Sequence, residues 1–94
     1  MSDPVVHHVL FYDYVADVTE RRKPYREAHL EHARAWKEKG KLVSGGALGK
    51  PPTGGMLVFL VDDPSEGDAF VADDPYVRNA IVTEHRVVPW TVVV

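Results

Sequence analysis

Two apolar stretches joined by a short turn, KLVSGGAL at residues 41–48 and MLVFLVD at residues 56–62, set the topology of this chain. The second stretch is a continuous apolar run of strand length. The first carries a glycine pair, Gly45 and Gly46, which indicates a bulge or a close approach of two backbones. Because GKPPTGG at 49–55 is rich in turn-forming residues, the pattern predicts two successive strands with no helix between them.

The residues that precede this pair predict a strand and then a helix. Residues 5–14, VVHHVLFYDY, are rich in β-branched and aromatic side chains and carry apolar residues at both odd and even positions. Residues 19–39 place apolar or small side chains three and four positions apart, which predicts a helix ended by Gly40. Since proline is favoured in a first helical turn, Pro24 predicts that the regular helix begins around residues 22–23.

The residues that follow the pair repeat this alternation. Residues 65–72, SEGDAFVA, predict a short second helix, which the Asp-Asp-Pro sequence at 73–75 interrupts, and residues 76–80 supply material for one more turn. Residues 81–94 predict a long last strand, in which Pro89 indicates an edge position or a kink.

The predicted order is therefore βαββαβ. With right-handed crossovers this order gives an α+β, ferredoxin-like fold, a four-stranded antiparallel sheet with two helices on one face. A chain of 94 residues forms one domain, residues 1–94. The helices leave the second face of the sheet uncovered although the strands are apolar on both faces, so we expect a second copy of the chain there and predict a homodimer.

Composition excludes several classes of function. The formal net charge is −3, and the one basic cluster, at residues 21–26, is too short to indicate a nucleic-acid-binding surface. MLVFLVD also lacks the basic and aromatic pattern of an RNA-recognition motif. The chain has no cysteine, hence no disulfide, no thiolate nucleophile and no thiolate-bound metal. With no signal-peptide pattern and no apolar run near about 18 residues, we expect a cytoplasmic protein without membrane contact.

Histidines are the main candidates for chemistry. His7 and His8 are adjacent on a strand, so they point to opposite faces and cannot share one site. His29 and His32 are three apart on the predicted helix and could share a metal ion, but no further ligand spacing supports a metal site. His85 lies in the last strand and its role stays open.

His29 differs from the other histidines because small and apolar residues flank its face of the helix. An inward imidazole needs a partner for its ring N–H, and a carboxylate would fix one tautomer for acid–base chemistry. The best-placed candidate is Asp74, which has an alternative role: Asp followed by Pro is also a good helix N-cap. Arg22 and Arg26 could bind an anionic oxygen, or could belong to a solvated basic face. Tyr12, Tyr76 and Trp90 are interpreted as packing groups that could also line a pocket.

The chain resembles the YciI-like (YCII-related) family. The resemblance rests on ERRKPYREAHL at 20–30, GKLVSGGAL at 40–48, GGMLVFLVD at 54–62, ADDPYV at 72–77 and EHRVVPW at 84–90, in this order. It implies a ferredoxin-like fold of the dimeric α/β-barrel type and a site centred on a histidine and an aspartate, which correspond here to His29 and Asp74 with Arg22 and Arg26 nearby. The family often has Gly-Pro where this chain has Gly46-Ala47, so the shape of the pocket is expected to differ.

Three functions are consistent with the sequence. The first is a small dimeric enzyme that transfers protons without a cofactor on a small anionic molecule, by isomerisation or elimination, with His29 as the acid–base group. The second is a non-catalytic dimeric module that binds a small molecule. The third is a haem or quinol monooxygenase of the same fold, because fold alone does not select among these functions.

Overall fold

The computed structural model describes residues 5–94, which form four strands and four helices. The elements in chain order are β1 (Val5–Tyr14), α1 (Val18–Arg21), α2 (Arg26–Glu38), β2 (Leu42–Leu48), β3 (Gly54–Phe59), α3 (Ser65–Asp73), α4 (Pro75–Arg78) and β4 (Val82–Val92).

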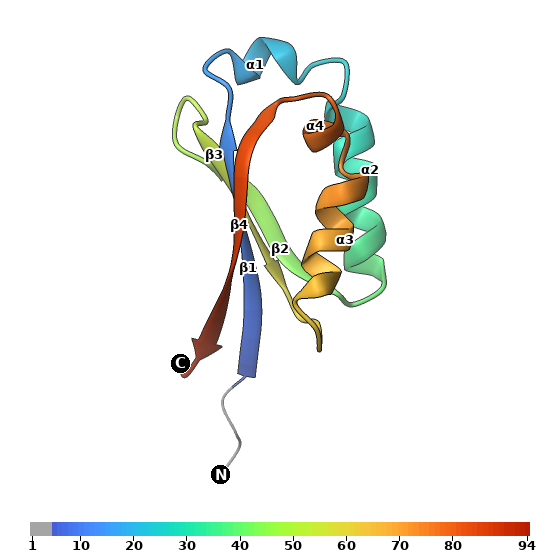
Figure 1. Cartoon of the computed structure of the whole chain (residues 1–94), viewed down its shortest axis with the longest axis vertical. Helices are drawn as coiled ribbons and strands as arrows, with labels where there is room; N and C mark the ends of the chain where they lie inside the picture. The colour runs from blue at the N-terminus through green and yellow to red at the C-terminus, as the bar shows by residue number, and fades with distance from the viewer. Residues whose placement is uncertain (1–4) are drawn as a thin grey trace.

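The strands form one antiparallel sheet in the order β2-β3-β1-β4. Figure 1 shows α2, α3 and α4 together on one side of this sheet, with α1 beyond its end. The predicted α+β, ferredoxin-like fold is confirmed, as is the edge position of the last strand. Pro89 lies opposite His8 within an uninterrupted β4, so the proline marks an edge and not a break. No helix in the described part of the chain is long and apolar enough to cross a membrane.

The predicted start of the long helix is wrong. The structure has a separate turn of helix, α1, and begins α2 at Arg26, because Pro24 disfavours the helical conformation in the residue before it. The first bond of α2 runs from His29 N to Tyr25 O at 2.9 Å. As a result Arg22 lies on the connection between α1 and α2. The sequence had predicted that it shares a regular helix with Arg26, and it does not.

The core lies between the helices and the sheet. Leu10 and Phe59 from the sheet and Phe70 from α3 are each fully buried. The rings of Phe59 and Phe70 meet edge to face with centroids 5.1 Å apart, and Trp36 of α2 packs edge-on against both. These contacts fix α2 and α3 over the sheet, and with them the residues that the two helices carry.

The two glycines of β2 have different surroundings, and neither forms a bulge. The register shift between β2 and β3 falls at Val43, between Leu42 and Ser44, and not at the glycines. The tightest approach at Gly45 is to a side chain and not to a second backbone, since a Cβ there would lie 3.1 Å from Cγ of Leu57. A Cβ at Gly46 would meet nothing within 4 Å. Gly45, Gly46 and Ala47 of β2 border the space between the sheet and α2.

The second face of the sheet carries apolar side chains that the helices do not cover. Because Leu10 points into the core, its neighbour Phe11 points to the opposite face, where it pairs with Met56 of β3. From β4, Val88 and Trp90 project from the same face and are 39% and 47% exposed. Helices α2, α3 and α4 lie on the other side of the sheet (Figure 1). Exposed apolar side chains on an uncovered sheet face favour association, so the homodimer stays our prediction.

A charge placed on this face is expected to separate the two copies. Wild-type protein should sediment at about twice the 10.5 kDa mass of one chain, and a Val88→Glu/Trp90→Glu double variant should sediment as a monomer, because two buried charges without partners cost several kcal/mol. Ala35→Glu, on the exposed side of α2, is the control and should leave the mass unchanged. A monomeric wild type, or a dimer that survives the double substitution, would contradict this interface.

Candidate functional site

A histidine of α2 and an aspartate that caps α4 meet on the helix side of the sheet. His29 Nδ1 lies 2.7 Å from Asp74 Oδ1, although the two residues are 45 positions apart in the chain. The His29 side chain is 12% exposed and the Asp74 side chain is fully buried. The structure therefore brings together the two residues that the sequence proposed as a pair.

Asp74 accepts hydrogen bonds from three donors. Its Oδ1 receives the His29 ring N–H and the backbone N–H of Tyr76 at 3.0 Å, and its Oδ2 receives the Tyr12 hydroxyl at 2.7 Å. The N-cap and the histidine partner are thus one carboxylate serving both roles. An ionised carboxylate is an acceptor only, so Nδ1 of His29 carries the proton, and Nε2 of the neutral ring keeps a lone pair.

Tyr12 is the part of this network that sequence reasoning missed. Burial raises the pKa of its hydroxyl well above the usual range, and the neighbouring Asp74 charge raises it further. The hydroxyl therefore stays protonated and donates to Asp74 throughout the physiological pH range. The signal was available in the alternation of β1, because Tyr12 shares the core face with Leu10 and a buried tyrosine needs a hydrogen-bond partner.

The imidazole of His29 is also fixed by stacking. Its ring lies parallel to the ring of Tyr76, with centroids 3.8 Å apart and an angle of 3° between the planes. Because Tyr76 follows Asp74 in α4, the same short segment supplies both the carboxylate and the stacking surface. Two independent contacts thus hold the histidine in one orientation.

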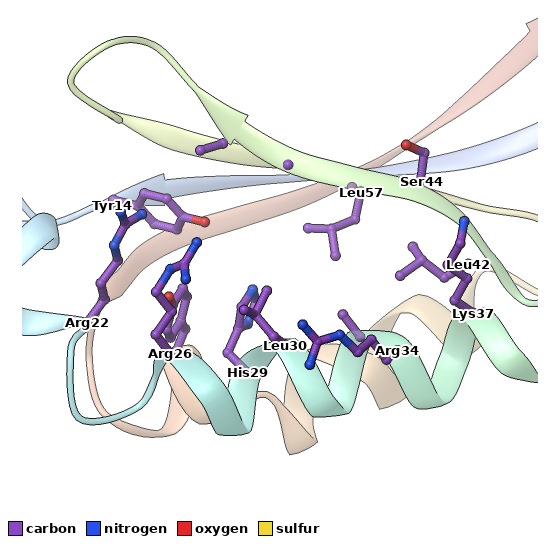
Figure 2. Close-up of a pocket in the computed structure, with 15 residues that line it drawn as sticks. Tyr14, Arg22, Arg26, His29, Leu30, Arg34, Lys37, Leu42, Ser44 and Leu57 are labelled. Atoms are coloured by element: carbon purple, nitrogen blue, oxygen red, sulfur yellow. The ribbon is translucent and has the colours of Figure 1, made fainter.

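His29 forms part of the wall of a cavity of about 420 Å³ between α2 and the strands β2 and β3. Figure 2 shows its ring projecting from α2 into this space, with Arg26 and Arg22 toward one end and Arg34 and Lys37 toward the other. None of the described residues, 5–94, that line the cavity is a carboxylate. The cavity is therefore positively charged and suits an anionic ligand.

The four cations differ in how far they are already engaged. Arg34 pairs with Glu27 at 3.2 Å, and Lys37 donates to the Val43 carbonyl at 2.7 Å. Within residues 5–94, Arg22 and Arg26 form no ion pair. The free positive charge is therefore at the end of the cavity close to the N-terminus of α2, beside His29.

The other histidines lie outside this cavity. His32 donates from Nε2 to the Phe70 carbonyl at 2.9 Å and stacks on the Phe70 ring at 4.4 Å, so it belongs to the packing between α2 and α3. His7 lies beside Trp90 on the uncovered face, and His8 lies on the helix side opposite Phe59, which confirms that they point to opposite faces. Across residues 5–94 no three potential ligands come close enough together to hold a metal ion.

A comparison with protein families now places the chain. The model of the YCII-related domain matches residues 6–91. This chain belongs to the YCII-related family. A search of the curated proteins gives no match.

Two solved structures share the fold of this YCII-related chain. One is 5-chloro-2-hydroxyhydroquinone dehydrochlorinase, TftG, from Burkholderia phenoliruptrix AC1100 in complex with 2,5-dihydroxybenzoquinone, at 22% identity and a TM-score of 0.78, over 90% of this chain and 93% of that one. The other is an uncharacterized NIPSNAP domain protein from Burkholderia xenovorans, at 16% identity and a TM-score of 0.55, over 94% of each chain. At these identities the likeness establishes the fold.

The positions that the family resemblance singled out gather at one place in this YCII-related domain. His29, Arg22 and Arg26 line the cavity, and Asp74 lies directly behind His29. The departure from the family pattern at 46–47 falls on the β2 wall of the same cavity. The catalytic role of these residues stays a prediction.

Proposed function

We propose that this protein is an enzyme that transfers protons on a small anionic molecule without a cofactor, with His29 as the acid–base group. The observation that carries the proposal is the contact of 2.7 Å between His29 Nδ1 and a fully buried Asp74 carboxylate, at the wall of a cationic cavity. A histidine held in this way presents a basic Nε2 to a bound ligand.

The reaction would proceed as follows. Nε2 of His29 takes a proton from the substrate, and the Asp74 carboxylate stabilises the imidazolium that forms. The electron pair left behind moves toward a substrate oxygen, whose negative charge Arg22 and Arg26 stabilise. In an isomerisation the imidazolium returns the proton to a different atom; in an elimination the electron pair expels a leaving group such as halide, and the proton passes to solvent.

The solved structure of TftG supports a more specific version of this proposal. TftG is named as a dehydrochlorinase, and loss of HCl requires a base for the proton as well as a site for an electron-rich ring. We therefore extend the proposal to hydroxylated and chlorinated six-membered rings as candidate substrates. The hydroxyquinone bound to TftG is acidic because its hydroxyls are conjugated to carbonyls, and this matches a cavity with two arginines that have no ion-pair partner within residues 5–94.

Binding of 2,5-dihydroxybenzoquinone and chloride release from 5-chloro-2-hydroxyhydroquinone test the proposal together. The quinone should bind to wild type, and Arg22→Gln and Arg26→Gln should each weaken binding by about 10- to 100-fold, because each removes a charged hydrogen bond worth about 1.5–3 kcal/mol. Lys39→Gln, at the far end of α2, is the control. Absorbance titration measures affinity and a chloride electrode measures turnover.

The outcomes separate the two leading functions. Chloride release above the uncatalysed rate, sensitive to both arginines, supports the enzyme. Binding of the quinone without chloride release, and without exchange of ring C–H for deuterium in D₂O, would support the non-catalytic binding module instead. Absence of both binding and turnover would overturn the proposed ring substrates.

A further inference from the structure

Tyr14, the last residue of β1, places a phenol in the cavity that the proposed mechanism does not yet use. Two positions after the core residue Tyr12, it points to the helix side of the sheet and lines the cavity with His29. Figure 2 shows its hydroxyl directed toward the space above Arg26 and His29. Among the described residues the hydroxyl has no hydrogen-bond partner, whereas the hydroxyl of Tyr12 is fully engaged by Asp74.

The ring of Tyr14 is held in place on several sides. It meets the Tyr76 ring edge to face at 6.1 Å and the Tyr12 ring at 6.4 Å, and its backbone N–H donates to the Thr53 carbonyl at 3.0 Å. The hydroxyl also lies against the backbone of β3, because a Cβ at Gly55 would be 2.6 Å from it. Gly55 therefore makes room for this phenol, and the neighbours that orient it are the same tyrosines that support Asp74 and His29.

The environment keeps this phenol protonated. Burial raises the pKa of Tyr14 to about 12, an effect that nearby Tyr76 and Asp74 reinforce and Arg22 opposes. At neutral pH the group is therefore a hydrogen-bond donor and not a base. A fixed donor in a partly buried cavity stabilises developing negative charge more than water does, because its dipole is already oriented.

We infer that Tyr14 is a further catalytic residue, which donates a hydrogen bond to the substrate oxygen that becomes negative when His29 removes the proton. The inference rests on the proposed function. Tyr14 keeps its own proton throughout, so the proton taken by His29 is the one that moves. Tyr76 is less suited to this task, because its ring is covered by His29 and the residue is 3% exposed.

Substituted phenolates are direct probes of such a donor. They present a negatively charged oxygen whose basicity changes with the substituent while the shape of the ring stays similar. In wild type, affinity should rise with the basicity of the phenolate, because a more basic oxygen accepts a stronger hydrogen bond from Tyr14. Affinities for 4-nitrophenolate and a graded series of halogenated phenolates would be measured by absorbance and calorimetry at one pH.

Tyr14→Phe should weaken 4-nitrophenolate binding by about 10- to 100-fold and should flatten the dependence on basicity. Tyr25→Phe removes a phenol outside the cavity and should change neither quantity. Gly55→Ala, which displaces the Tyr14 hydroxyl while leaving the phenol in the chain, should flatten the dependence as well. Gly67→Ala on α3 adds the same methyl group in an ordinary contact and is its control.

The results distinguish this inference from the proposed function. If Tyr14→Phe binds the phenolates as wild type does, with the same dependence on basicity, while Arg26→Gln binds weakly, Tyr14 is no donor and the anion site stands. If wild type binds no phenolate of the series, the anion site and the role of Tyr14 are both overturned. The inference is supported if Tyr14→Phe keeps the wild-type melting temperature but its affinity for the phenolates no longer depends on their basicity.

Discussion

Replacing His29 by Gln is expected to lower kcat by about 10²- to 10⁴-fold, the range that loss of a positioned acid–base group produces. Glutamine is close to histidine in size, and the buried Asp74 carboxylate keeps two donors, the Tyr12 hydroxyl and the Tyr76 N–H. It has no titratable nitrogen, however, and cannot take the proton. The rate is measured by the chloride-release and deuterium-exchange assays described for the proposed function. Binding of the quinone should change much less than kcat, because the arginines remain.

His32→Gln is the matched control for this prediction. It lies one turn further along the same helix, makes its ring hydrogen bond to a backbone carbonyl and does not line the cavity. A smaller variant, His29→Ala, adds a second test, because added imidazole should bind in the space left by the ring and restore part of the rate. A His29→Gln enzyme with the rate of wild type, or one no slower than His32→Gln, would remove His29 from the mechanism.

The fold followed from the sequence because its main signals are local. The stretches at 41–48 and 56–62 are apolar and separated by turn residues, so two successive strands are a consequence of short-range preferences. Boundaries were less reliable. Pro24 fits the first turn of a helix as well as it fits a break between two helices. In the structure Val18 of α1 is buried, and α2 begins only at Arg26.

The candidate site was predictable in part, because some of its features also follow from local sequence patterns. Periodicity and the flanking small residues indicated that His29 points inward, and the Asp-Pro sequence indicated a cap at Asp74. Their contact depends on how α2 packs beside α4, which no local pattern specifies. The hydroxyls of Tyr12 and Tyr14 are harder still, because the partner of Tyr12 is 62 residues away and the space for Tyr14 is provided by a glycine on another strand.

Asp74 is expected to matter for stability as much as for chemistry, because the same carboxylate completes the site and caps α4. Asp74→Ala leaves the Tyr12 hydroxyl, the His29 ring and the Tyr76 N–H without an acceptor in a place where the side chain is fully buried. Each unsatisfied buried group costs about 1–3 kcal/mol, and partial access of water to His29 lowers the sum, so we expect a loss of about 3–5 kcal/mol in the free energy of unfolding.

Urea unfolding at one protein concentration measures this loss, since a dimer would make stability depend on concentration. Asp74→Asn keeps one acceptor oxygen but turns a donor toward groups that are themselves donors, so it should fall between Asp74→Ala and wild type. The adjacent Asp73 is exposed, and Asp73→Ala should change stability by less than about 0.5 kcal/mol. Equal stabilities of Asp74→Ala and Asp73→Ala would mean that the three donors find other partners, and the fixed orientation of His29 would then need another cause.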